Sequence, residues 1–193
     1  MFKKIILFAF FVLSVGSISF AALDLGLENP VDTALFVQID PHGVGKPKEM
    51  EEKICNDIKD KINAAHHGIV SVDKAQQDLR VYVRENVESM TKRDADEGFI
   101  LKGKDFKALA EMENVRYVLL VSVRITSSET KTNFWLGERK NLTVLTEVFL
   151  YDTQENKYLI AEEFTDIGKT SGSYDRAYNR AIKEMLTKIE INY

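Results

Sequence analysis

The sequence predicts a single α/β (α+β) domain. We expect a mixed β-sheet of about five strands, with helices packed mainly on one face, in the order β-α-β-α-α-β-β-β-α. Three observations support this. The 193 residues are 45% hydrophobic and 29% charged, with ten Gly and three Pro, which is an ordinary globular composition. Segments with helical apolar spacing alternate with β-branched apolar runs. Neither an internal repeat nor a linker divides the chain.

The N-terminal segment has the pattern of a secretory leader. A positive start with Lys3 and Lys4 is followed by the apolar run 5–15, and Ser19 and Ala21 are the small residues that signal peptidase requires. We therefore predict cleavage after Ala21. An uncleaved anchor is the alternative, because the apolar stretch approaches the length that crosses a bilayer. A lipoprotein is disfavoured, since no cysteine stands at the cleavage site.

The predicted domain organisation follows from that cleavage site. Residues 1–21 are the signal peptide, residues 22–32 are a lead-in segment, and residues 33–193 are the α/β domain. The predicted location is extracytoplasmic, in the periplasm or the medium.

The first half of the domain reads as a strand, a helix, a short strand and a second helix. The strand at 34–39 is stopped by Asp40-Pro41, and Pro47 begins a helix that Gly68 ends as its C′ residue. A short strand at 69–72 precedes a helix capped by Asp73. The apolar stripe of the first helix is Met50, Ile54, Ile58, Ile62 and Ala65.

The second half begins with a short helix at 105–113 and an almost continuous apolar strand at 116–125, as expected of a strand buried on both faces. Residues 126–139 read as a polar connection. Strands at 142–151 and 158–164 then form a hairpin, and a closing helix starts near Ser171 or Ser173.

Charge and cysteine content exclude several functions. The formal charge is −4, and it becomes −6 when Lys3 and Lys4 leave with the leader. Such a chain lacks the clustered cations that nucleic acid requires, and it disfavours tight docking on anionic lipid. Its one cysteine, Cys55, cannot form an intramolecular disulfide, which fits a bacterial envelope. We predict no cofactor and no stable membrane insertion after cleavage.

Most residues with reactive side chains have a simpler structural interpretation. The adjacent His66 and His67 point in different directions and lack a third ligand, so we predict no metal. Cys55 follows the apolar Ile54 and reads as a buried hydrophobe. The loop at 42–46 lacks the spacing of a phosphate loop. We expect the acidic residues of the last strands to be solvated: Glu147, Glu162, Glu163 and Asp166. The sequon at Asn141 is read as chance.

The connection between the two longest strands carries the strongest candidate for a binding site. It holds the only Trp, in the run Phe134, Trp135, Leu136, with Lys131 and Arg139 on either side. Apolar aromatics in a polar hairpin loop often mark a contact surface. In the alternative interpretation they fold back and cap the end of the core. Both interpretations stay open at this point.

Three stretches resemble a group of bacterial envelope proteins that includes CsgG, LpoB and the N-terminal domain of TolB. The first is the strand ending in Asp40 with its following helix and the short strand at 69–72. The second is 109–123, a helix, a polar turn and a buried strand. The third is 148–158, similar to the group's strand–"Asp-Thr-x-x-Gly-Lys"–strand hairpin with Asn156 in place of glycine. The resemblance implies an exported protein-binding domain and transfers no catalytic residue.

We therefore expect a non-catalytic envelope accessory protein that binds another envelope protein through the sheet edge or the Phe134–Trp135 loop. The first alternative is a homo-oligomer that forms part of a secretion or envelope-assembly apparatus. The second alternative is a hydrolase that uses Glu162, Glu163 or His66.

Overall fold

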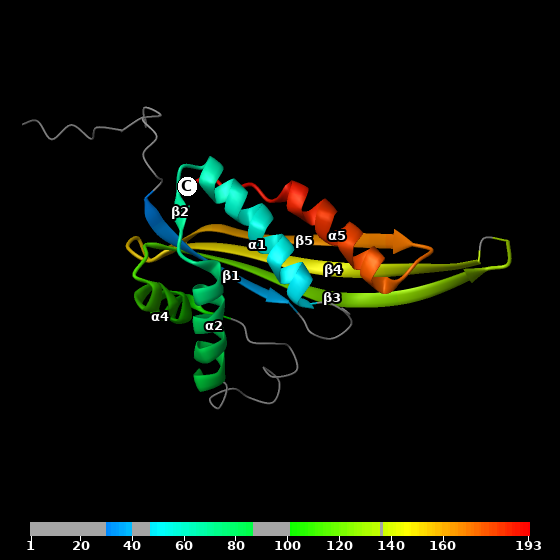
Figure 1. Ribbon diagram of the computed structural model, residues 1–193, viewed down its shortest axis with the longest axis horizontal. Helices are drawn as coiled ribbons and strands as arrows, with labels where there is room; N and C mark the ends of the chain where they lie inside the picture. The colour runs from blue at the N-terminus through cyan, green and yellow to red at the C-terminus, as the bar shows by residue number, and fades with distance from the viewer. Residues whose placement is uncertain (1–29, 40–46, 87–100, 136) are drawn as a thin grey trace, which may run out of the picture.

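The computed structural model describes residues 30–39, 47–86, 101–135 and 137–193. Within these residues it contains four helices and one five-stranded sheet, in the order that the sequence predicted (Figure 1). The elements are β1 (Val31–Ile39), α1 (Pro47–Ala64), β2 (Gly68–Ile69), α2 (Val72–Asn86), α4 (Gly103–Glu113), β3 (Tyr117–Asn133), β4 (Gly137–Asp152), β5 (Lys157–Thr170) and α5 (Tyr174–Lys188).

The sheet is mixed, as predicted, with the strand order β2-β1-β3-β4-β5. Strand β1 runs parallel to β2 and to β3, and the β1–β3 register extends from the pair Thr33–Tyr117 to the pair Ile39–Val123. Strands β3, β4 and β5 form an antiparallel meander. The C-terminal half of the chain therefore supplies most of the sheet.

Helices cover both faces of the sheet, and this corrects the prediction that they lie mainly on one face. Leu35 and Leu119 belong to a core cluster with α1 and α5, whereas Phe36 and Leu120 belong to a second cluster with α2 and α4. Figure 1 shows these two helix pairs on opposite sides of the strands. The physical reason is that β1 and β3 are apolar at consecutive positions, so each face of both strands has to be covered.

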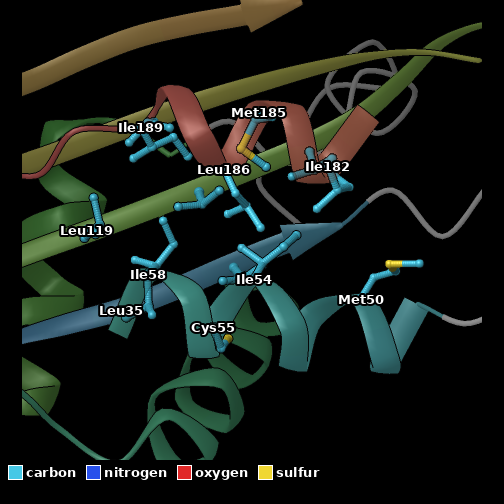
Figure 2. Close-up of a cluster of buried hydrophobic side chains, with 14 of the residues drawn as sticks. Leu35, Met50, Ile54, Cys55, Ile58, Leu119, Ile182, Met185, Leu186 and Ile189 are labelled. Carbon is cyan, nitrogen blue, oxygen red and sulfur yellow. The ribbon is translucent and has the colours of Figure 1, made fainter. Parts of the chain in front are cut away.

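The larger cluster joins α1 to α5 over the centre of the sheet. Ile54 and Ile58 of α1 approach Leu186 of α5, and Leu35 and Leu119 lie beneath them (Figure 2). On the strand side, α5 lies very close to β5 at Gly168, where an added Cβ would lie 1.7 Å from the main-chain oxygen of Ala177. The absent side chain of Gly168 is thus what allows helix and strand to touch.

Helix boundaries mostly agree with their sequence signals. Helix α1 begins at Pro47, and Ser173 caps α5 with its Oγ accepting from the Arg176 N–H at 3.4 Å. The prediction that Gly68 is the C′ residue of the first helix is wrong. His66 instead adopts the left-handed conformation, with φ 64°, and Gly68 begins β2. The short strand predicted at 69–72 is therefore Gly68–Ile69 in the structure, and Val72 already belongs to α2.

Residues 126–139, predicted as a polar connection, instead extend β3 and β4. The two strands stay paired from Ser127–Thr143 out to Asn133–Gly137. Thr126, Thr130 and Thr132 lie in this stretch, and β-branched side chains suit an extended strand even where it faces water. A long hairpin therefore replaces the expected loop.

Candidate interaction surface

The β3–β4 hairpin extends beyond the rest of the sheet. Strand β1 pairs with β3 only as far as Val123, and β5 pairs with β4 only as far as Lys140. Beyond the Thr130–Lys140 pair, only β3 and β4 remain. We call residues 126–133 of β3 and 137–141 of β4 the arms, and β5 still pairs with the arms at Lys140 and Asn141 (Figure 1). The arms hold their end loop away from the helix-covered core.

Helix α5 braces the arms near their base. The Tyr174 hydroxyl, at the start of α5, lies 2.8 Å from Oγ1 of Thr130. Nζ of Lys140 lies 5.1 Å from the centre of the same tyrosine ring, within range of a cation–π contact. The sequence gave no sign of this contact between the closing helix and the hairpin. One side chain thus fixes both arms to the body of the domain.

The tip of the hairpin presents two aromatic side chains to solvent. Phe134 is 91% exposed and Trp135 is 87% exposed, and their rings meet edge to face at 5.3 Å. This favours the contact-surface interpretation over the alternative in which the rings cap the core. Gly137, with φ 71°, closes the turn opposite Asn133. Leu136 lies outside the described residues.

Lys131 and Arg139 lie directly opposite each other across the arms and are both exposed. Nζ of Lys131 lies 3.3 Å from a carboxylate oxygen of Glu129. Like charges placed opposite each other on paired strands repel, and Arg139 has no ion pair among the described residues, so an unpaired positive charge lies next to the aromatic tip. The arrangement suits an apolar partner surface that carries carboxylates.

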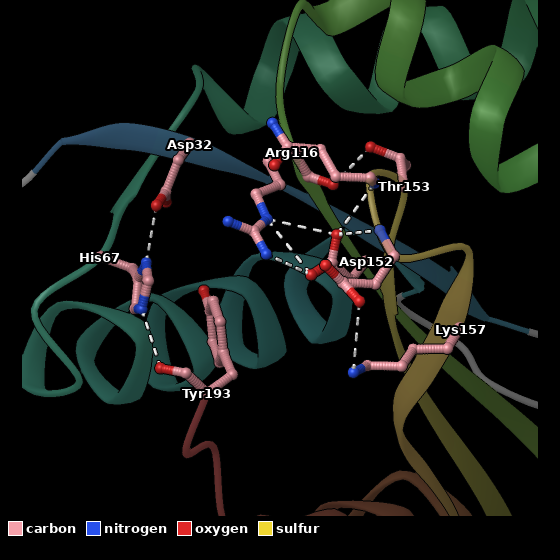
Figure 3. A network of polar contacts seen from close by, with 9 residues as sticks. Asp32, His67, Arg116, Asp152, Thr153, Lys157 and Tyr193 are labelled. Atoms are coloured by element: carbon pink, nitrogen blue, oxygen red, sulfur yellow. Dashed lines mark hydrogen bonds and ion pairs between the residues drawn. The ribbon is translucent and has the colours of Figure 1, made fainter. Parts of the chain in front are cut away.

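The two histidines separate, as the sequence predicted. His66 is exposed, whereas His67 is half-buried in the polar network drawn in Figure 3. Nδ1 of His67 lies 2.7 Å from Oδ2 of Asp32, and Nε2 lies 3.1 Å from the main-chain oxygen of Tyr193. The imidazole also stacks on the Tyr193 ring, with centroids 4.0 Å apart. His67 therefore attaches the segment after α5 to β1.

Asp152 organises the turn between β4 and β5 (Figure 3). Its carboxylate accepts from Nη2 of Arg116 at 2.6 Å and from the N–H groups of Gln154 and Glu155. The Arg116 guanidinium, helped by these two N–H groups, lowers the pKa of the Asp152 carboxyl. Asn156 takes φ 53° in the same turn, where the resembling motif has glycine. The motif is therefore a structural turn in this chain.

Cys55 is buried in the larger core cluster, as predicted. Burial raises the pKa of its thiol to about 12, and the neighbouring Glu51 and Asp73 act in the same direction. A thiol of this kind holds almost no thiolate at neutral pH, so Cys55 is unsuited to nucleophilic chemistry.

The acidic residues of the last strands do not converge on one site. Glu162 and Glu163 point to opposite faces of β5 and are exposed. Glu147 accepts a hydrogen bond from Nη2 of Arg124 at 3.1 Å. Asp166, which we expected to be solvated, is instead buried and accepts from Nζ of Lys188. His66, the base named in the hydrolase alternative, lies in the turn after α1. The structure thus assembles no acid–base pair from these residues.

Within the described ranges no three His, Cys, Asp or Glu side chains gather as a metal site, and no helix there is long and apolar enough to span a bilayer. His42 and the loop at 42–46 lie outside those ranges.

Comparison with known proteins identifies similar structures only. No family model and no curated protein matches this chain. The lipoprotein GNA1162 from Neisseria meningitidis is 12% identical, covers 82% of this chain and 97% of its own, and gives a TM-score of 0.43. The LpoB C-terminal domain from Escherichia coli is 16% identical, with coverages of 72% and 84% and a TM-score of 0.35. A PelC dodecamer from Paraburkholderia phytofirmans is 15% identical, with coverages of 86% and 92% and a TM-score of 0.39.

The LpoB domain, a member of the group that three stretches of the sequence resemble, is among these structures. At 12% to 16% identity, no residue role is carried from those chains to this one.

Proposed function

We propose that this protein is an exported, non-catalytic binding protein of the bacterial envelope, which contacts a protein partner through the tip of the β3–β4 hairpin. One observation carries the proposal. The arms, braced by Tyr174, hold Phe134 and Trp135 in solvent at 91% and 87% exposure. An exposed aromatic pair on a positioned hairpin is the kind of group that anchors a protein interface.

The chemistry of the tip indicates what the partner presents. Aromatic anchors fill apolar pockets near the centre of an interface, and polar contacts surround them. Lys131 and Arg139 stand behind the aromatic pair on one face of the arms. The partner is therefore an envelope protein with an apolar pocket that is bordered by carboxylates.

Export rests on the leader pattern, with cleavage after Ala21. The single cysteine agrees with it, because a domain without disulfides depends only on its core for stability after export. The scattered positions of Glu162, Glu163 and His66 support a non-catalytic role. The alternative, an oligomeric component of an envelope apparatus, requires a surface through which copies of this chain associate.

Site-specific photocrosslinking in intact cells tests the proposal. A photoreactive amino acid placed at Thr132, next to the tip, is expected to give a discrete adduct with one envelope protein. Trp135→Ala is expected to reduce that adduct at least about tenfold, the usual effect of removing an aromatic anchor.

Met112→Ala is the matched control, because Met112 is also apolar and 43% exposed but lies on α4. It is expected to leave the adduct unchanged. Retention of every adduct by the Trp135→Ala chain would show that the hairpin tip is not the binding surface.

A further inference from the structure

The sheet has an open face beyond the reach of α2 and α4. Phe149 and Tyr151 of β4 pack against those helices. Side chains alternate along a strand, so residues 139, 141, 143, 145 and 147 of β4 point to the same side of the sheet as Phe149 and Tyr151. All five are exposed or half-buried. The strand register adds their partners on β3 and β5. The open face thus comprises Ser122, Arg124, Ser127, Glu129, Lys131, Arg139, Asn141, Thr143, Leu145, Glu147, Glu163, Thr165, Ile167 and Lys169.

Charges on the open face separate along the strands. Three cations, Lys131, Arg139 and Lys169, lie at the end near the tip together with the single acid Glu129. Glu147 and Glu163 form a directly opposed pair at the end near the helices, together with Arg124. Arg139 and Glu147 are eight positions apart on β4, which corresponds to about 26 Å. The open face is therefore positive at one end and negative at the other.

Much of this charge has no ion-pair partner among the residues that the structure describes. Glu129 lies 3.3 Å from Lys131, and Glu147 lies 3.1 Å from Arg124. For Arg139, Lys169 and Glu163, by contrast, no ion pair occurs within the part of the chain that the structure describes. The two ends thus carry surplus charges of opposite sign.

Apolar side chains lie between the charged ends. Ile167 is 55% exposed although it is strongly apolar, and Leu145 on the neighbouring strand is half-buried. Both lie on the open face, between the Arg139 and Glu147 positions along β4. An exposed apolar centre with charges at its ends has the composition of a protein interface.

We infer that the open face is a self-association surface, on which a second copy of this chain packs face to face with its strands antiparallel. In that arrangement the positive end of each copy lies over the negative end of the other, and Ile167 and Leu145 meet near the twofold axis. The contact is isologous, because the same residues serve on both copies. Two sheet faces pack in this way about 10 Å apart.

Charge complementarity favours a second copy over an anionic membrane. A lipid surface that attracts Arg139 and Lys169 repels Glu147 and Glu163 on the same face, and the whole chain carries a net charge of −4. A second copy satisfies both ends at once. The inference goes beyond the proposed function: it shares Lys131 and Arg139 with that function, but it adds the rest of the open face and does not need Phe134 or Trp135.

Charge reversal combined with mixing tests the inference. One variant, Arg139→Glu with Lys169→Glu, makes the positive end negative, and a second variant, Glu163→Lys, makes the negative end positive. Each is measured as the full chain by sedimentation velocity at low ionic strength, alone and mixed in equal amounts. The matched control is Glu162→Lys, the same change on the adjacent exposed residue that points to the other face of β5.

The native chain and Glu162→Lys are expected to be dimers that dissociate as salt is raised. Each open-face variant alone is expected to dimerise at least about tenfold more weakly, because like charges then face each other. Their mixture is expected to recover the native dimer, since each variant supplies the charge that the other lacks.

A native chain that stays monomeric throughout the concentration range would overturn the inference. So would a mixture that fails to dimerise, or a control as weak as Glu163→Lys. Binding of the monomer to vesicles of anionic phospholipid, without dimers, would assign the open face to a membrane. The Trp135→Ala chain separates the two proposals, because it is expected to lose the partner adduct and to keep the dimer.

Discussion

The helix-covered half of the sheet and the arms are built from the same two strands under different constraints. Val118 to Val121 of β3 are all buried, with successive side chains in the two core clusters. Farther along the same strand, the described side chains from Thr126 to Thr132 are all exposed. The first region is ordered by burial on two faces, and the second by strand pairing and by the contact with Tyr174. Substitutions of exposed side chains in the arms are therefore expected to cost little stability.

The largest expected effects lie in the covered half, and the loss at Gly168 is one of them. Gly168→Ala is expected to lower the free energy of unfolding by about 3 kcal/mol or more, because its Cβ would lie 1.7 Å from the Ala177 oxygen and α5 would have to move. Urea unfolding followed by circular dichroism measures the change.

Gly137→Ala is the comparison in the arms. An added Cβ at Gly137 meets nothing within 4 Å, so only its φ of 71° opposes the substitution, at a cost of about 1 kcal/mol. Equal losses for the two variants would contradict the close approach of α5 to β5.

The next effect concerns acid stability and the turn at Asp152. Because the pKa of Asp152 is lowered in the folded protein, its stabilising contribution is complete above the unfolded-state value, and it is lost as the pH falls through the folded-state value. Asp152→Asn is expected to cost about 2 kcal/mol at pH 7, through the weakened contact with Arg116 and the turn N–H groups.

The measurement is the unfolding free energy of both chains between pH 7 and pH 2. Their difference is expected to shrink below about pH 4, where the native carboxyl also becomes neutral. Glu155→Gln in the same turn is the control, because its side chain is exposed and its charge pairs only at 3.8 Å with Lys157. A difference in unfolding free energy between the native and Asp152→Asn chains that does not change with pH would refute a stabilising role for the ionised Asp152 carboxyl.

A smaller and local effect is expected where the two regions meet, at Tyr174. Tyr174→Phe removes the hydroxyl contact with Thr130 and keeps the ring beneath Lys140. We expect faster amide hydrogen exchange in 126–133 and a change in global stability below about 1 kcal/mol. Exchange measured by mass spectrometry should leave 117–123 unaffected. Equal acceleration in both segments would mean that Tyr174 supports the core instead of the arms.

Sequence patterns predicted the covered half better than the arms. In the covered half, each signal specifies structure within a few residues, so the sequence pattern alone located the elements. These signals are the apolar runs at 34–39 and 116–125, the proline at the start of α1 and Ser173 before α5. The placement of helices on both faces depends on tertiary packing. The continuous apolar run of β3 requires a cover on both faces of the sheet, but the order of elements does not show on which face each helix packs.

The sequence did not predict the arms, because their extended conformation depends on pairing between β3 and β4 and not on local sequence. Ser127 to Thr132 lacks the apolar alternation that identifies a half-buried strand, and its pairing with β4 is what extends it. Phe134, Trp135, Lys131 and Arg139 were identified as candidates, but their exposure became apparent only with the hairpin. Arg124, Glu163, Ile167 and Lys169 were not recognised as one surface, because they come from strands that only the register brings together.

The smallest expected effect on stability belongs to the tip. Trp135→Ala is expected to change the free energy of unfolding by less than about 0.5 kcal/mol, because the side chain is 87% exposed. Phe106→Ala, at a fully buried aromatic of the second cluster, is expected to cost about 3 to 5 kcal/mol. Since Trp135 is the only tryptophan, its fluorescence reports the tip directly, and acrylamide is expected to quench it strongly in the folded protein. Weak quenching, or a loss of stability near that of Phe106→Ala, would mean that the ring is buried in solution and that the hairpin tip is part of the core.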